Sequence, residues 1–199
     1  KGYWSFNGKD LSGTTAYDRS GAGNTGTLTN GPTVTPGKLG QALNFDGVND
    51  NVNMGNVTSL KNSVFTYSAW INPTSLSAER NIFGGGAAST PRFSITTGGI
   101  LTFLKTGVAT IGVSTGTAPT VGVWTHVAVT YDVSGNYIFY INGVNAGSGT
   151  NAQTFDFTSA SFGIGSDSGN MFVGKIDEVR VYNRALSAAE ITSLYNASR

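Results

Sequence analysis

Apolar and polar residues alternate in short runs along almost the whole chain, and turn-forming residues separate the runs. Alternation with a period of two, rich in Val, Ile, Phe, Tyr and Thr, is typical of β-strands with one buried face. The pattern predicts strands over residues 2–6, 41–45, 63–73, 80–84, 92–96, 100–104, 124–132, 136–143, 161–165 and 175–182.

Turn residues lie between these runs at hairpin spacing, for example TGG at 97–99, SGN at 134–136 and ING at 141–143. No helical pattern alternates with the strands, so a parallel sheet with a cofactor crevice is not expected. The fold class predicted from this pattern is all-β, with two antiparallel sheets packed as a jelly-roll sandwich.

A helix is predicted only near the C-terminus. Ser187 and Glu190 have the spacing of a capping box, in which the serine oxygen accepts a hydrogen bond from a first-turn N–H and the glutamate reaches back. Leu186, Ile191 and Leu194 then supply an apolar face. We therefore expect one short helix docked on the sandwich.

The last predicted strand, KIDEVRVY at 175–182, carries an acid where the alternation predicts core. Because successive strand side chains point to opposite faces, Asp177 is expected to share the core face with Val179. Ile176, Glu178 and Arg180 then lie on the other face, where the glutamate and the arginine can form an ion pair. A carboxylate on a core face needs a proton, hydrogen bonds or a bound cation.

Composition narrows the possible functions. The 199 residues are 39% hydrophobic and 12% charged, and we expect one domain spanning 1–199. A net charge of +1 without a basic run argues against a nucleic-acid partner. The absence of cysteine excludes disulfides, thiol nucleophiles and thiolate metal sites. No signal peptide or membrane span is visible, so direct membrane insertion is not expected.

The titratable residues form no catalytic pattern. Retaining glycosidases need two carboxyl groups roughly 5–5.5 Å apart, whereas Glu79, Asp132, Asp156 and Asp167 each stand alone in or near a turn. The single histidine, His126, lies within a predicted strand and not beside a nucleophile on an exposed elbow. We predict that His126 is structural and that the chain is not an enzyme.

Several segments, taken in order, resemble one family: GYWSFN at 2–7, FDGVND at 45–50, FTYSAWINP at 65–73, WTHVAVTYD at 124–132 and IDEVRVYNRALSAAE at 176–190. They are similar to the bacterial laminin-G-like jelly-roll domains of the concanavalin A-like lectin/glucanase superfamily, over essentially the whole chain. Asn51 departs from that pattern, because these domains often carry an aromatic residue there.

The resemblance implies a non-catalytic recognition or adhesion module, extracellular or on a bacterial cell surface, that binds a glycan or a surface protein. It also implies that the module is part of a larger polypeptide. Two other roles remain open: an exposed head or subunit of a bacterial surface filament, and an accessory carbohydrate-binding domain of a secreted glycoside hydrolase. Fold alone does not identify the ligand.

The resemblance further implies a structural calcium ion that ties the N-terminal region to the last strand. The glycine-rich loop at 18–26 provides Asp18 and Asn24, with a carbonyl from Gly26 or Thr25, and Asp177 would complete the oxygen ligands. On the residues alone, Asx-turns and backbone hydrogen bonds explain these side chains better than a metal does. With the resemblance, calcium becomes the favoured interpretation.

Three residues are predicted as ligand contacts. Arg80 and Arg92 flank a glycine-rich segment at 83–90 and could bind an acidic sugar or a partner carboxylate, although they could equally be solvated surface charges. Tyr140 could offer an aromatic face to a sugar ring, because its predicted strand is amphipathic. The tryptophans at positions 4, 70 and 124 are expected in the core.

Overall fold

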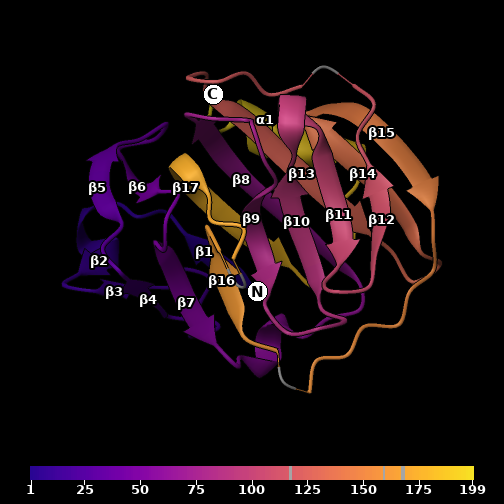
Figure 1. The fold of residues 1–199 in the computed structure, drawn as a ribbon, viewed down its shortest axis with the longest axis horizontal. Coiled ribbons are helices and arrows are strands. Elements are labelled where there is room, and N and C mark those ends of the chain that lie inside the picture. Colours follow the sequence, from indigo (N-terminus) through magenta and orange to yellow (C-terminus); the bar gives the residue numbers. More distant parts are fainter. Residues whose placement is uncertain (117, 159, 167–168) are drawn as a thin grey trace.

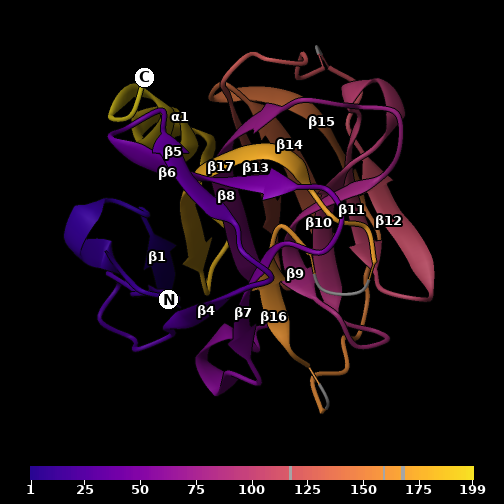
Figure 2. The ribbon, with the colours of Figure 1, turned by 60° about the vertical axis from the view of Figure 1, so that its left-hand side comes forward.

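The computed structural model of the chain describes residues 1–116, 118–158, 160–166 and 169–199. Two β-sheets, in which every strand pair is antiparallel, pack face to face, and one helix lies outside one of them (Figure 1; Figure 2). The predicted jelly-roll sandwich with one C-terminal helix is confirmed.

The eight-stranded sheet contains the first and the last strand of the chain. Its order is β15-β14-β13-β8-β17-β6-β5, and β1 pairs with β17. Its strands are β1 (Gly2–Trp4), β5 (Thr33–Pro36), β6 (Gln41–Asp46), β8 (Phe65–Pro73), β13 (Thr125–Tyr131), β14 (Asn136–Ile141), β15 (Val144–Thr150) and β17 (Val173–Tyr182).

The nine-stranded sheet forms the other layer, in the order β12-β11-β10-β9-β16-β7-β4-β3-β2. Its strands are β2 (Leu11–Ser12), β3 (Thr15–Ala16), β4 (Gly26–Thr29), β7 (Asn51–Gly55), β9 (Arg80–Gly85), β10 (Pro91–Ile95), β11 (Leu101–Lys105), β12 (Ala109–Val113) and β16 (Phe162–Ile164). Short 3-10 turns lie at Gly8–Asp10, Thr58–Leu60 and Thr97–Gly99. Every predicted strand is present, whereas β2–β5, β7, β12 and β15 were missed because their Gly, Thr and Asn content hides the alternation.

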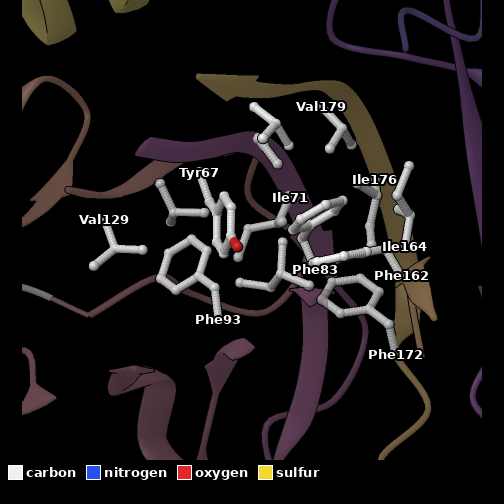
Figure 3. Close-up of a cluster of buried hydrophobic side chains, with 14 of the residues drawn as sticks. Tyr67, Ile71, Phe83, Phe93, Val129, Phe162, Ile164, Phe172, Ile176 and Val179 are labelled. Atoms are coloured by element: carbon white, nitrogen blue, oxygen red, sulfur yellow. The ribbon is translucent and has the colours of Figure 1, made fainter. Parts of the chain in front are cut away.

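Aromatic and branched side chains from both sheets fill the space between the layers (Figure 3). Tyr67 of β8 meets Phe83 of β9 edge to face, with ring centroids 4.7 Å apart. Trp4 lies in this core as predicted, whereas Trp124 precedes β13 and is only partly buried. Trp70 is also buried, but on the outer side of the eight-stranded sheet, where it contacts the ring of Tyr195.

Because of a β-bulge in β17, the side chain of Asp177 does not point to the predicted face of the sheet. Glu178 has a φ of +53°, and the pairing of β17 with β8 shifts register between Asp177 and Arg180. A bulge inserts one extra residue, so side chains on either side of it no longer follow a single alternation. Alternation alone cannot reveal this insertion.

The bulge returns the apolar residues of β17 to one face. Ile176 and Val179 both lie in the core, on opposite sides of the bulge. Asp177 pairs with Trp70 and therefore lies on the outer face of the sheet. The prediction that Asp177 shares the core face with Val179 is wrong.

The helix α1 (Ala188–Asn196) covers that outer face. Its capping box is formed as predicted, because Glu190 N–H donates to Ser187 Oγ and Ser187 N–H donates to the Glu190 carboxylate. Ile191 packs into a second apolar cluster with Tyr140 and Ala128 of the sheet. The helix α1 therefore covers the outer face of the eight-stranded sheet at Ala128 and Tyr140.

Candidate functional site

The 18–26 loop is organised by the carboxylate of Asp18. Its Oδ1 accepts hydrogen bonds from the backbone N–H groups of Tyr3 (2.9 Å) and Ser20 (2.8 Å). Its Oδ2 accepts from Ser20 Oγ (2.8 Å) and from the backbone N–H of Asn24 (2.9 Å). Partial burial opposes ionisation, but these four donors outweigh it and hold the pKa of Asp18 below its usual value.

Asn24 and Gly26 also have local roles. Asn24 Nδ2 donates to the carbonyl of Lys1, and its Oδ1 accepts from Ser59 Oγ at 2.5 Å. The Asn24 carbonyl accepts from Trp4 Nε1 at 2.9 Å. Gly26 begins β4 where a Cβ would lie 2.6 Å from Val52 Cγ1, so the glycine there is required by close packing.

Asp177 binds a different part of the chain. Its Oδ2 accepts from the Leu39 N–H (2.9 Å) and its Oδ1 from the Glu178 N–H (2.7 Å). Asp177 thereby attaches the 37–39 loop to β17. Burial raises its pKa to about 7.

The predicted calcium ligands do not fit one metal shell in this arrangement. Calcium takes six to eight oxygen ligands, whereas Asp18, Asn24 and Asp177 have no hydrogen-bond partner in common and their oxygens face N–H and O–H donors. Within the described ranges, no three Asp, Glu, His or Cys side chains form a group that could hold a metal. Calcium binding stays a prediction from the resemblance alone.

Glu178 joins the first strand to the last. Tyr3 Oη donates to Glu178 Oε1 at 2.9 Å, and Arg180 Nη2 donates to Glu178 Oε2 at 2.7 Å. The predicted Glu178–Arg180 ion pair is thus present. The Arg180 guanidinium also lies 4.2 Å from the centre of the Tyr3 ring. Burial and the hydrogen bond to Glu178 raise the pKa of Tyr3 to about 12, so all three groups serve the pairing of β1 with β17.

His126 occupies an aromatic environment. Its ring lies 5.5 Å from Trp70 and 6.2 Å from Tyr195 of α1, and it is 4% exposed. Burial, with a smaller contribution from the charge of Arg180, lowers its pKa to about 4. A neutral, enclosed imidazole fits the structural role predicted for it.

The isolated acids lie in turns or ion pairs. Asp132 accepts from the N–H groups of Ser134 and Asn136, and Asp156 accepts from the N–H of Thr158. Asp167 lies outside the described residues.

The three predicted ligand contacts do not come together. Tyr140 is 1% exposed beneath α1, so the prediction that its ring faces a sugar is wrong. Arg92 is 8% exposed, and its Nη2 lies 2.5 Å from Glu79 Oε1. Arg80 Nη1 donates to the carbonyl of Met171 at 3.0 Å. Both arginines are therefore engaged within the protein.

The strands β4, β7 and β16 are neighbours in the nine-stranded sheet (Figure 1). The outer face of the sheet has two pockets over these strands. One pocket, of about 170 Å³, lies over β7 and β16; a second, of about 380 Å³, lies over β4 and β7; Asn53 lines both. We call the two pockets together the neutral trough, because none of their described lining residues is charged. They are Asn51, Asn53, Ser161, Phe162, Gly163, Ser166 and Met171 for the first, and Thr25, Thr27, Thr29, Asn53, Met54 and Gly55 for the second.

Asn53 lines both pockets of the neutral trough, and the N–H₂ group of its side chain is available as a hydrogen-bond donor. Its Oδ1 accepts from the Gly55 N–H (2.7 Å) and from Ser161 Oγ (3.2 Å), whereas its Nδ2 has no partner among the described residues. The buried Oγ of Ser166 in the same lining also lacks a partner there. Sequence analysis missed these residues, although the alternation of Asn51 with Asn53 and of Thr27 with Thr29 carried a signal.

Asp177 and His126 should affect stability in opposite directions over one pH range. Between pH 4 and 7 the folded state holds a proton on Asp177 that the unfolded state has lost, so this contribution to stability falls as pH rises. Between pH 4 and 6.5 the folded state lacks a proton on His126 that the unfolded state binds, so this contribution falls as pH drops.

We expect His126→Phe to lose more stability than the parent as the pH rises from 4 to 7, because the opposing contribution of His126 is gone. Asp177→Asn should instead gain more stability than the parent from pH 4 to 6.5, because the opposing contribution of Asp177 is gone. Urea unfolding of both variants and the parent across this range measures the two slopes. If the free energy of unfolding changed with pH in the same direction in both variants, the opposite effects assigned to Asp177 and His126 would be contradicted.

Comparisons with known proteins agree with the architecture. The model of the concanavalin A-like lectin/glucanases superfamily of laminin-G type matches residues 46–192. Domain 4 of AbnA, an extracellular GH43 arabinanase from Geobacillus stearothermophilus solved in complex with arabinotriose, is 28% identical with a TM-score of 0.77; the match covers 98% of this chain and 97% of that domain. A search of curated protein sequences found no match.

More distant structures share the fold. The binding domain of botulinum neurotoxin serotype G is 19% identical with a TM-score of 0.73, and the match covers 98% of this chain and 50% of that one. Trypanosoma rangeli sialidase in complex with sialic acid is 18% identical with a TM-score of 0.69, and the match covers 98% of this chain and 32% of the sialidase. In the described part of the chain, no helix has the length and apolar character needed to span a bilayer. The chain belongs to the concanavalin A-like lectin/glucanases superfamily.

Proposed function

We propose that the chain is a non-catalytic carbohydrate-binding module of a larger extracellular protein and that the neutral trough holds the sugar. The full-length match to domain 4 of the arabinanase, solved with arabinotriose, supports a glycan ligand. It also favours an accessory domain of a secreted glycoside hydrolase over the filament head or subunit, for which the structure offers no specific observation.

The observation that carries this proposal is the position of Asn53. Its free amide N–H₂ lies where two pockets meet, and hydroxyl groups of Thr27 and Ser161 lie in the lining on either side. Sugar recognition needs convergent donors and acceptors in a concave site. On the opposite sheet, α1 covers part of the outer face.

The arrangement of acids supports a binding role without catalysis. Glu178 is 4% exposed and is held by Tyr3 and Arg180. Asp177 lies next to it in the chain but is enclosed by the 37–39 loop. The described lining of the neutral trough contains no carboxylate that could act as acid or nucleophile on a sugar bound there.

Thr27→Ala should weaken binding of arabinotriose, or of the tightest ligand in a panel of neutral oligosaccharides, by about 2–10-fold, the effect of one lost hydrogen bond. Thr27 is exposed in β4 and its hydroxyl has no described partner, so folding should be unaffected. Isothermal titration measures the change.

Thr110→Ala is the matched control, because Thr110 is exposed on β12 of the same sheet and lies outside the trough. Equal losses in both variants would contradict binding at the trough. A parent protein that binds no oligosaccharide in the panel would contradict the glycan-binding function itself.

The calcium ion of the family resemblance can be tested by thermal unfolding. Because protein donors already occupy the carboxylate oxygens of Asp18, we expect the same melting temperature with added calcium and with a chelator. A calcium-dependent rise in melting temperature that Asp18→Asn abolishes would instead establish the ion at this loop.

A further inference from the structure

We propose that the neutral trough selects uncharged oligosaccharides over acidic ones and that Asn53 Nδ2 is the hydrogen-bond donor at its centre. This inference rests on the proposed carbohydrate-binding function and specifies its ligand class.

One line of residues crosses the outer face of the nine-stranded sheet. Thr27 of β4 pairs with Asn53 of β7, Asn53 with Gly163 of β16, Gly163 with Gly84 of β9, and Gly84 with Arg92 of β10. Directly paired residues of neighbouring strands share a face. Arg92 is therefore the charged residue that this line brings toward the trough.

The positive charge of Arg92 is paired with a carboxylate of the protein itself. Its guanidinium is 2.5 Å from Glu79 and its side chain is 10% exposed. The backbone carbonyl of Ser166 lies over Gly163, since a Cβ on that glycine would be 2.1 Å from the Ser166 oxygen. The backbone at Ser166 therefore lies over the sheet between Arg92 and Asn53.

Arg80 is directed elsewhere. It pairs with Ile95, a core residue, so its side chain leaves the sheet from the inner side. Its Nη1 donates to the carbonyl of Met171, which lines the first pocket, but Arg80 itself is not among the described lining residues.

The lining favours hydroxyl groups over carboxylates. A sugar hydroxyl that leaves water can exchange its hydrogen bonds for those of Asn53, Asn51 and the threonines, at little net cost. A carboxylate that enters the same site loses hydration and meets no positively charged side chain among the described lining residues, which is costly. An acidic sugar should therefore bind more weakly than a neutral one of the same length.

The dimensions of the trough favour a chain of sugars over a single ring. Its two pockets, of about 170 and 380 Å³, share Asn53 and extend over β4, β7 and β16. Neighbouring strands are about 4.8 Å apart, so the trough spans roughly 10 Å across the sheet. Rings on both sides of Asn53 could then contact its amide group.

Asn53→Asp tests the donor and the charge together. The aspartate keeps an oxygen that can accept from the Gly55 N–H and Ser161 Oγ, but it replaces the free N–H₂ with an anion. We expect affinity for a neutral trisaccharide such as arabinotriose to fall at least about tenfold, the effect of losing a donor and burying an unpaired charge.

Asn145→Asp is the matched control. Asn145 is exposed on β15, and its Oδ1 accepts from the Gly147 N–H at 2.8 Å, in the same Asn-x-Gly spacing as Asn53 and Gly55. The control should leave affinity unchanged. Because Asn145 lines a separate pocket at the β14–β15 end of the sandwich, loss of binding in Asn145→Asp alone would overturn the assignment to the trough.

Ligand charge is tested by titrating the intact chain with arabinotriose, trigalacturonate and sialyllactose in low and high salt. We expect arabinotriose to bind with an affinity that salt does not change, and the two acidic sugars to bind at least tenfold more weakly. Equal or tighter binding of an acidic sugar would overturn the selection for neutral ligands and leave the carbohydrate-binding function intact. Failure to bind any sugar, neutral or acidic, would overturn both.

Discussion

The β-bulge at Glu178 sets the facing of the side chains along β17. The contact between the first and last strands and the outer face of the eight-stranded sheet both depend on it. One extra residue in β17 lets Ile176 and Val179 both reach the core, so the apolar face of the strand survives. The same insertion places Asp177 against the 37–39 loop and Glu178 against Tyr3 of β1. A regular strand would direct one of these carboxylates into the apolar core, where it would have to be neutralised.

The two outer faces of the sandwich differ in what covers them. On the eight-stranded sheet, α1 packs over Tyr140 and adds Tyr195 to the rings of Trp70 and His126. On the nine-stranded sheet, β4 and β7 present Thr and Asn side chains around two hollows. One outer face is thus partly covered by a helix, whereas the other is open over β4 and β7.

Charged residues are few, and several of them are paired with one another in the described structure. Arg92 pairs with Glu79, Arg180 with Glu178, and Arg19 with Asp10. Such pairs restrain loops and strand ends, and they leave the hollowed sheet face to neutral polar groups. Recognition there would depend on hydrogen bonds and shape, which suits hydroxyl-rich ligands better than acidic ones.

The sequence by itself determined the fold class, every strongly alternating strand and the capped C-terminal helix, because period-two burial and the Ser187–Glu190 capping box are local signals. The family also followed from ordered motifs. Only the tertiary structure decided the facing of Asp177, the burial of Tyr140 beneath α1 and the place of Asn53 between two pockets. These depend on a one-residue bulge and on contacts between segments far apart in the chain, which local alternation does not encode.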